Sequence, residues 1–471
     1  MSSPSGIQIA NLRYVLAAVV ALGASMYATT SFAQEKSNQL CRVEAVDYEG
    51  WQAQQVSNAW VKLVIVPRIG GRVMQVYFNG HPYLFVNPKF KGQYLTPLGP
   101  DAKHRWFNYG GDKIWPMPEG DEDDHHWPGP VSDALDDGDY AFRVLSTSPS
   151  CKVRLDGPPD SRTGLQYSRE ITLENDSPEI RFHVIMKNIA NHPIAWSVQS
   201  VTQYDTGNAA NPGDYNRDFW AYTPTNASSA YLEKFHVRAG LVNDPSFGMK
   251  DGLFCLHWLP LENEVWIDST AGWVAVVDEA AKYGMVERFH YSAKDEYPGK
   301  ATVIFFKNGS GLTLDDEGFP TLKGMHDGNP LRYMEAELNS PIAKLAPGET
   351  YAMDTEWHPV RTGREIVDVM DAGACGTAFQ AKRISAGSVH LEGDFGVFFS
   401  GQLQADLLDE QGKKLKSVVV ESVSVEAPVK LDQTISAAAR ASRVSLHLID
   451  ASGQDRGELG SAPILAKDKS S

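Results

Sequence analysis

Residues 180–203, IRFHVIMKNIANHPIAWSVQSVTQ, decide the fold class of this chain. Two runs, 180–189 and 194–203, are rich in β-branched and aromatic residues and flank a polar turn. Such runs between turn residues are typical of β-strands. Because few segments show a helical period, the chain is predicted to be an all-β sandwich rather than a parallel α/β sheet. Further runs of the same kind lie at residues 60–66, 72–78, 82–86, 142–145, 166–173, 273–277, 302–306 and 331–338.

The texture of the sequence changes near residue 361. Ile366, Val367 and Met370 have helical spacing, which predicts a short helix in a connector over residues 361–384. Beyond the connector, apolar and polar residues alternate, and the turn sequence DEQG at 409–412 indicates a hairpin. A chain of 471 residues exceeds the length at which a single core stops growing. We therefore expect a large β-domain over 41–360 and a small immunoglobulin-like β-sandwich over 385–471.

The first 33 residues have the order of a secretory signal peptide. A basic residue precedes an apolar run at 14–27, and small residues at 28–33 follow it. An uncleaved membrane anchor is the alternative, but the run is shorter than the roughly 20 residues that a bilayer span needs. We predict cleavage after Ala33, a periplasmic or secreted location, and no stable membrane insertion afterwards.

Charge and cysteine content narrow the partners and the compartment. The formal net charge of −16 argues against a nucleic-acid partner, which requires clustered Lys and Arg. The four cysteines form no C-x-x-C pair. In an exported chain they allow one or two disulfides of undetermined pairing, and buried free thiols are the alternative. The cysteines are Cys41, Cys151, Cys255 and Cys375.

The segment HRWFNYGGDKIWP at 104–116 holds the strongest chemical signal, and we expect it to form a loop. Sugars present C–H faces that lie on aromatic rings and hydroxyls that need charged or amide partners, so this mixture suits a sugar cleft. The alternative is that the rings are core residues and the Asp-Lys step is a surface ion pair. The candidate sugar-binding residues here are Trp106, Asn108, Asp112, Lys113 and Trp115.

Two predicted strands add polar side chains. On the strand at 331–338, a period of two places Tyr333, Glu335 and Glu337 on one face. If that face lines a cleft, one carboxylate is placed to act as a general base; if it faces solvent, it is an ordinary strand surface. Gln203, on the strand at 194–205, is a further candidate for binding hydroxyls or an ordinary cross-strand residue.

Several chemistries have no motif in the chain. It contains no G-x-S-x-G elbow, no phosphate-binding glycine loop and no H-E-x-x-H. The acidic residues 121–124 precede His125 and His126, but their spacing matches no established calcium or zinc loop. We predict no metal site and no cofactor.

At these residues the chain resembles the galactose mutarotase-like superfamily. It is more closely similar to a family of exported mutarotase-like proteins of unknown function that carry an N-[FY]-G-G-D-K-x-W-P segment. The similarity covers roughly residues 46–360, and it includes PRIGGR at 67–72, NYGG at 108–111, and Glu337 followed by LAPGE at 345–349. The resemblance implies a supersandwich fold and adds Arg72, in the opening hairpin, to the candidate sugar-binding residues.

The resemblance also implies a catalytic pair for sugar epimerisation, a glutamate base and a histidine acid. Glu337 stands at the glutamate position, whereas Tyr109 stands at the first histidine position and Gln203 where the catalytic histidine would fall. An amide does not titrate near neutral pH, so Gln203 cannot be the acid. We therefore expect a carbohydrate-binding cleft, or alternatively an epimerase or related sugar enzyme with Glu337 as base and His126 or Tyr109 as acid.

Overall fold

The computed structural model describes residues 40–99, 106–119, 126–309, 311–314, 320–323, 331–363 and 365–466. The predicted signal peptide at 1–33, His104 and His125 lie outside these ranges. Within them, no helix combines the length and apolarity that a membrane crossing requires.

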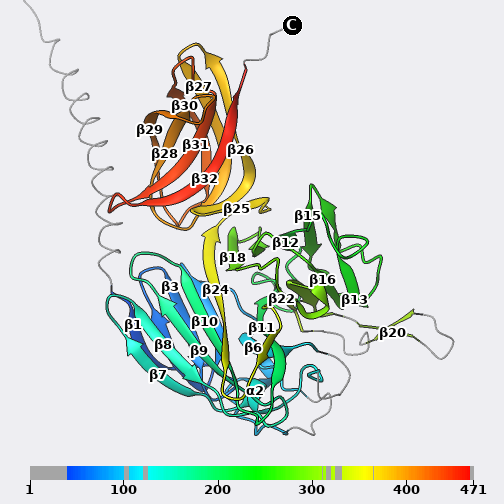
Figure 1. The fold of residues 1–471 in the computed structure, drawn as a ribbon. Coiled ribbons are helices and arrows are strands. Elements are labelled where there is room, and N and C mark those ends of the chain that lie inside the picture. The colour runs from blue at the N-terminus through cyan, green and yellow to red at the C-terminus, as the bar shows by residue number, and fades with distance from the viewer. Residues whose placement is uncertain are drawn as a thin grey trace, which may run out of the picture.

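The large domain consists of two mainly antiparallel sheets (Figure 1). The first sheet has twelve strands. They are β1 (Arg42–Tyr48), β2 (Trp51–Ser57), β3 (Val61–Val66), β4 (Arg72–Phe78), β5 (His81–Pro82), β6 (Asp112–Met117), β11 (Ile194–Asp205), β13 (His236–Gly240), β16 (Asn263–Ile267), β19 (Val303–Lys307), β22 (Tyr333–Asn339) and β23 (Ala343–Leu345).

The second sheet has ten strands and packs against the first through a shared apolar core. A separate hairpin joins β20 (Gly311–Leu314) to β21 (Pro320–Lys323). The strands of the second sheet are β7 (Ala141–Ser146), β8 (Cys151–Asp156), β9 (Leu165–Leu173), β10 (Ile180–Asn188), β12 (Phe219–Pro224), β14 (Phe247–Lys250), β15 (Leu253–His257), β17 (Trp273–Asp278), β18 (Tyr283–Phe289) and β24 (Thr350–Arg361). The predicted all-β sandwich is confirmed.

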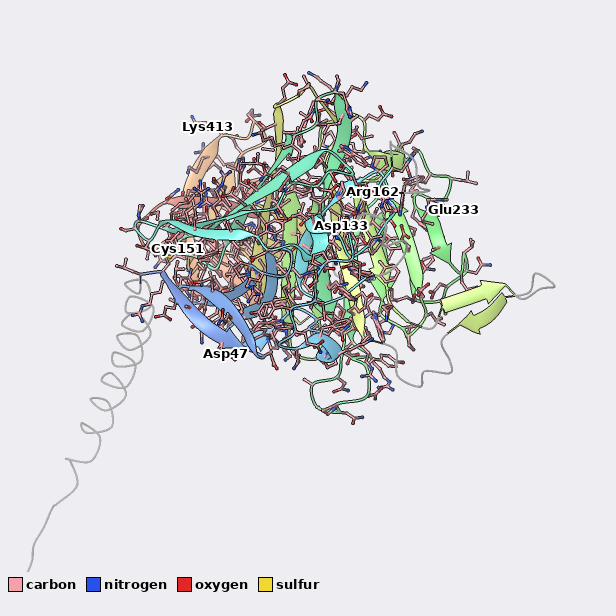
Figure 2. The ribbon with its side chains drawn as sticks, turned by 90° about the horizontal axis from the view of Figure 1, so that it is seen from below. Asp47, Asp133, Cys151, Arg162, Glu233 and Lys413 are labelled. Carbon is pink, nitrogen blue, oxygen red and sulfur yellow. A yellow bond between two sulfur atoms is a disulfide. The ribbon has the colours of Figure 1, made fainter. Side chains whose placement is uncertain are left out.

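Helices are short in the described part of the chain: the 3₁₀ turns η1 (Pro88–Phe90) and η2 (Pro298–Lys300), and the one-turn helix α2 (Ala134–Asp137). Asp133 caps α2, because its side chain accepts hydrogen bonds from the backbone N–H groups of Leu135 and Asp136. A disulfide joins Cys41 to Cys151, while Cys255 and Cys375 are free thiols. Seen from below, Asp133 lies near the middle of the molecule and Glu233 lies toward its edge (Figure 2).

The small C-terminal domain follows β24 directly, and Figure 1 shows it beyond the end of that strand. Its eight strands form one sheet that encloses an apolar interior, which confirms the small β-sandwich. The predicted hairpin at 409–412 is also confirmed, because it joins two of these strands. They are β25 (Asp368–Met370), β26 (Gly373–Ser385), β27 (Ser388–Val397), β28 (Gly401–Leu408), β29 (Lys414–Val423), β30 (Val429–Ser436), β31 (Arg443–Asp450) and β32 (Asp455–Leu465).

The short helix predicted in the connector over residues 361–384 is wrong. Residues 368–370 form β25, which pairs with the first residues of β26. Ile366 is buried, and Val367 and Met370 pack against the core, so their spacing serves a strand pair and not a helix face. Strand pairing across the tight turn at 371–372 overrides the weak helical period of so short a segment.

Candidate functional site

One face of the first sheet collects most of the polar residues singled out by the sequence. The strand β11 lies between β6 and β22, and Val201 is opposite both Lys113 and Glu337. Side chains directly opposite one another in a sheet share a face, and the face repeats every second residue. This face, called here the carboxylate face, therefore carries Lys113, Trp115, Gln199, Gln203, Tyr333, Glu335 and Glu337, and through β19 and β16 also Phe306, Glu264 and Trp266.

Glu335 is at the centre of the carboxylate face. Its Oε1 accepts a hydrogen bond from Lys113 Nζ at 3.0 Å and another from Gln203 Nε2 at 2.7 Å. Lys113, Gln203 and Glu335 are each at most 5% exposed, so the ion pair is shielded from water. Burial lowers the pKa of Lys113, and the neighbouring Glu335 charge opposes that shift.

Glu337 has a different environment from Glu335, although it is two residues away on the same face. Its Oε2 accepts a hydrogen bond from Gln199 Nε2 at 2.5 Å. Burial holds the pKa of Glu337 well above its usual range, and the nearby carboxylates of Glu335, Glu264 and Glu119 add to the shift. Burial and the neighbouring negative charges thus act in the same direction, toward the protonated form of Glu337.

The outer part of the carboxylate face is half-exposed. Glu264, Trp266 and Phe306 are each partly accessible, whereas their immediate neighbours in β16 and β19 are buried. Glu119 lies beyond β6, and its carboxylate lies so close to Gly129 that a Cβ there would overlap it. Burial and the charge of Glu264 raise the pKa of Glu119 to about 7. Burial likewise raises the pKa of Glu264.

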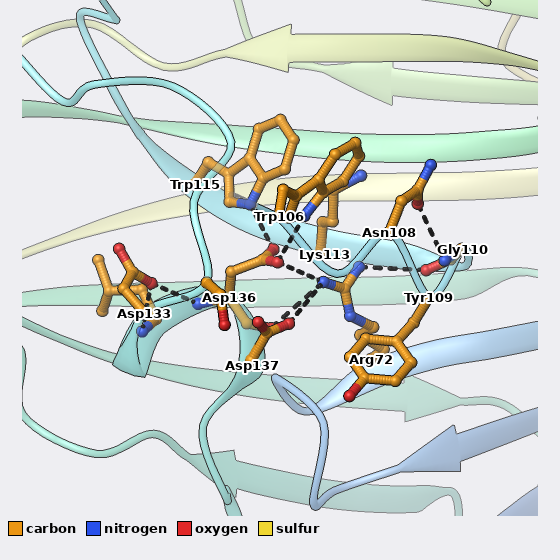
Figure 3. Close-up of polar contacts among 12 residues, drawn as sticks. Arg72, Trp106, Asn108, Tyr109, Gly110, Lys113, Trp115, Asp133, Asp136 and Asp137 are labelled. Carbon is orange, nitrogen blue, oxygen red and sulfur yellow. Dashed lines mark hydrogen bonds and ion pairs between the residues drawn. The ribbon is translucent and has the colours of Figure 1, made fainter. Parts of the chain in front are cut away.

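Aromatic rings and a buried aspartate hold one side of the face in place (Figure 3). The ammonium of Lys113 lies 4.3 Å from the centre of the Trp115 ring and 5.3 Å from that of Trp106. Both indole N–H groups donate to the carboxylate of Asp136 on α2, Trp115 at 2.6 Å and Trp106 at 2.8 Å. The helix α2 thus fixes the orientation of the two rings that flank Lys113.

Arg72 holds the helix α2 in place and is not accessible to a ligand at the carboxylate face. It is fully buried, and it pairs with Asp136 at 2.7 Å and Asp137 at 3.7 Å. Burial and the Asp136 charge raise the pKa of Asp137 to about 9. The expectation that Arg72 binds sugar is therefore corrected, because its guanidinium is engaged by two buried aspartates.

Asp112 is on the opposite face of β6 from Lys113, because residues 112–117 form a strand and not the loop that was expected. Its fully buried carboxylate faces the second sheet and pairs with Arg169 of β9. It also accepts a hydrogen bond from Thr202 Oγ1 of the neighbouring strand β11 at 3.2 Å. This correction removes Asp112 from the sugar-binding residues. Asp112, Arg169, Thr202, Glu287 and Tyr204 are called here the inter-sheet cluster. Glu287 accepts a hydrogen bond from Tyr204 Oη at 2.5 Å, and burial raises the pKa of Glu287 to about 8.

The other candidates from the 104–116 segment divide between two places. The side chain of Asn108 lies near enough to Tyr333 to oppose the rise that burial causes in the pKa of that tyrosine, so this residue does reach the site. Tyr109 has no exposed surface; it packs in a separate apolar cluster with Trp51, and its hydroxyl accepts from the backbone N–H of Leu95. Its expected role as the acid is thereby corrected.

His126 is half-buried and immediately precedes Trp127, which bridges to Glu119. Glu119, from the same region, is among the charges that raise the pKa of Glu337. The assignment of His126 as the acid stays a prediction.

Sequence reasoning missed Glu119, Glu264 and the aspartates of α2. Glu264 and Trp266 belong to an alternating segment, NEVWI, whose polar face could have been noticed as a strand signal. The cap signal of α2 is the Asp133 of the segment SDALDD. Neither pattern shows by itself which distant strand it joins.

One group of side chains in the described ranges has the spacing of metal ligands. The ligand atoms of Glu179, Glu356 and His358 lie within 4.8 Å of one another. However, Arg181 approaches Glu179 at 3.6 Å and Arg288 approaches Glu356 at 4.0 Å, which supplies positive charge without an ion. We interpret the group as an ion-pair cluster, and the expected absence of a metal stays a prediction.

No protein-family model matches the chain, and no curated protein matches it. Among solved structures, a TPR-domain containing protein from Parabacteroides distasonis is 14% identical, with a TM-score of 0.45 over 70% of this chain and 54% of its own. Galactose mutarotase-like proteins from Lactobacillus casei and Clostridium acetobutylicum are both 10% identical, with TM-scores of 0.42 and 0.41.

The two mutarotase-like structures cover 65% and 69% of this chain and 99% of their own lengths. This chain spans about half the length of the Parabacteroides protein. Two of these three structural neighbours are galactose mutarotase-like proteins, and the likeness is a distant one of fold.

Proposed function

We propose that the chain is an exported carbohydrate-binding protein that holds a sugar on the carboxylate face. The observation that carries this proposal is a pair of buried amide oxygens. Gln199 and Gln203 direct their N–H₂ groups to Glu337 and Glu335, and the buried Oε1 atoms of both glutamines have no hydrogen-bond partner among the residues that the structure describes. Buried acceptors normally have partners, so a ligand rich in O–H donors explains them.

The orientation of the Gln203 amide follows from its partner. Glu335 is ion-paired with Lys113, and a charged carboxylate only accepts hydrogen bonds, so Gln203 must present its nitrogen to it. Its carbonyl oxygen must then point elsewhere. Partly exposed Trp106 and Trp266 at the same face offer ring surfaces for the C–H side of a sugar.

Two further features support export. The chain begins with the signal-peptide pattern described above. The disulfide between Cys41 and Cys151 suits an oxidising compartment such as the periplasm or the exterior of the cell.

Calorimetric titration with neutral monosaccharides and oligosaccharides tests the proposal. For a sugar that binds, we expect Gln203→Met to weaken affinity about tenfold, because a buried hydrogen bond to the ligand is lost. Gln402→Met, at an exposed position of β28, is the matched control and should bind as the wild type does. Circular dichroism on both variants monitors folding. If no sugar binds, or if the two variants bind alike, the carboxylate face is not a sugar site.

The contrasting states of the two glutamates favour a second candidate, anomer interconversion. Glu335 forms an ion pair with Lys113, whereas burial raises the pKa of Glu337 well above its usual range. Neighbouring carboxyl groups in opposite protonation states suit acid–base work. In this candidate Glu337, which the sequence assigned as the base, acts instead as the acid because its pKa is raised. It donates its proton to the ring oxygen while Glu335 removes the proton of the anomeric hydroxyl. The ring C–O bond breaks and then re-forms on the other face of the carbonyl.

NMR measurement of anomer exchange tests the second candidate. Glu337→Gln should slow exchange at least about 100-fold and leave affinity within a few-fold, because the amide keeps the shape but cannot transfer the proton. Glu421→Gln, on a partly buried carboxylate of β29, is the matched control. A wild-type protein that accelerates exchange of no free sugar would leave only the binding function.

A further inference from the structure

A cavity lies at the junction of the two domains, away from the carboxylate face. Its volume is about 460 Å³, within the range of small-molecule sites. The large domain contributes Trp60, Lys62, Asn79 and Arg361, and the C-terminal domain contributes Glu426. The cavity is therefore complete only when both domains are present.

The walls of the junction cavity are held in place by hydrogen bonds. Asn58 fixes the turn before β3, since its Oδ1 accepts from the backbone N–H groups of Trp60 and Val61 and its Nδ2 donates to two carbonyls near β10. The backbone N–H of Asn79 donates to the Trp60 carbonyl at 3.2 Å, which ties the two turns together. Across the junction, Arg456 of the C-terminal domain donates to Asp176 at 2.6 Å.

The cavity holds two cations, Lys62 and Arg361, and one carboxylate, that of Glu426, which has an interaction of its own. The Arg361 guanidinium lies 3.9 Å from the centre of the Tyr283 ring. The same ring stacks on that of His81, with 4.2 Å between the two ring centres. The Arg361 Nε is buried without an acceptor. Lys62 is exposed. Two cations beside a half-exposed indole thus face one cavity.

We propose that the junction cavity binds an anionic saccharide unit, a pyranose that carries a carboxylate or a sulfate. Lys62 and Arg361 pair with the anionic group, because charge-assisted hydrogen bonds are the strongest that an exposed site offers. The Trp60 ring receives the C–H face of the sugar, and the Asn79 amide meets a hydroxyl. This second site is independent of the carboxylate face, and it gives the C-terminal domain a role in binding.

The experiment is a calorimetric titration of the whole mature chain with glucuronate, glucose 6-sulfate, glucose and inorganic sulfate. We expect the two anionic sugars to bind, glucose and inorganic sulfate to bind at least tenfold more weakly at this site, and affinity to fall as salt is raised. Lys62→Gln should weaken binding of the anionic sugars about tenfold. Lys187→Gln, on an exposed lysine of β10 outside the cavity, is the matched control and should leave binding unchanged.

Trp60→Leu distinguishes the contribution of the ring from that of the charge. It should weaken binding of the anionic sugars and leave the weak binding of inorganic sulfate unchanged. Glu337→Gln should not alter binding at the junction, so that failure of the carboxylate face and failure of this site remain distinguishable. Equal binding of inorganic sulfate and glucuronate would overturn the saccharide assignment. Insensitivity to Lys62→Gln, or no binding of either anionic sugar, would overturn the site itself.

Discussion

The two faces of β6 carry polar clusters that are equally buried and yet differ in what they can do. Asp112 points toward the second sheet and joins the inter-sheet cluster, while its neighbour Lys113 points to the carboxylate face. Asp112 is 0% exposed and Lys113 is 2% exposed. Burial and charge alone therefore do not distinguish a structural ion pair from a binding site.

The difference lies in the unpaired atoms and in what surrounds them. In the inter-sheet cluster the donors left over belong to Arg169, whose guanidinium lies 4.3 Å from the centre of the Phe182 ring between two sheets. On the carboxylate face the unpaired atoms are amide acceptors, and the neighbouring strands β16 and β19 present half-exposed side chains. Unpaired amide oxygens beside half-exposed strands indicate a binding site. An ion pair enclosed between two sheets indicates a role in stabilising the fold.

The largest effect that this comparison predicts is on stability at the inter-sheet cluster. Asp112→Ala removes the carboxylate that Arg169 pairs with and leaves a buried guanidinium without its counter-charge. Breaking a buried pair in this way costs about 3–5 kcal/mol of unfolding free energy. Urea unfolding followed by tryptophan fluorescence measures the change.

The double variant Asp112→Ala/Arg169→Met is the control for that measurement. It removes both charges, so most of the lost stability should return. If Asp112→Ala alone unfolds at the same urea concentration as the wild type, the ion pair between Asp112 and Arg169 does not stabilise the fold.

The next effect is a pH dependence of stability from the same cluster. Burial raises the pKa of Glu287 to about 8, above the value it has when unfolded. Between these two values the folded state holds a proton that the unfolded state releases, so unfolding free energy should fall by about 1.4 kcal/mol per pH unit from this group as pH rises, and level off above about 8. Glu287→Gln should remove that slope, as urea unfolding at pH 5, 6, 7 and 8 would show. An unchanged slope in the variant would contradict the neutral state of Glu287.

Strand periodicity predicted much of this arrangement. Tyr333, Glu335 and Glu337 were expected on one face, and the register of β22 against β11 and β19 places them so. Gln203 follows from the same rule applied to β11. Alternation is local, so a single strand is enough to infer it.

The sequence could not show which candidate residues lie on opposite faces of the sheet. Treating residues 104–116 as a loop left Asp112 and Lys113 together, whereas a strand separates neighbours by the thickness of the sheet. Glu119 and Glu264 reach Glu337 only through pairings between segments far apart in the chain, which no local pattern encodes. The sequence thus shows which residues of one strand share a face, but it does not show which strands come together to form the site.

The smallest predicted effect concerns stability at the carboxylate face. Burial raises the pKa of Glu337 and so favours its neutral form, and a glutamine reproduces the shape and charge of a neutral carboxyl group. Glu337→Gln should therefore change the unfolding free energy at pH 7 by less than about 1 kcal/mol, within the range of mild substitutions.

Glu337→Ala is the matched comparison, because it leaves the Gln199 amide nitrogen without its acceptor and should cost about 1–3 kcal/mol. The two variants differ only in whether a polar group remains opposite Gln199, so their difference isolates that hydrogen bond. A loss of several kcal/mol from Glu337→Gln would mean that Glu337 is charged in the folded protein. The carboxylate face would then stabilise the fold in the same way as the inter-sheet cluster does, and the contrast between the two faces of β6 would disappear.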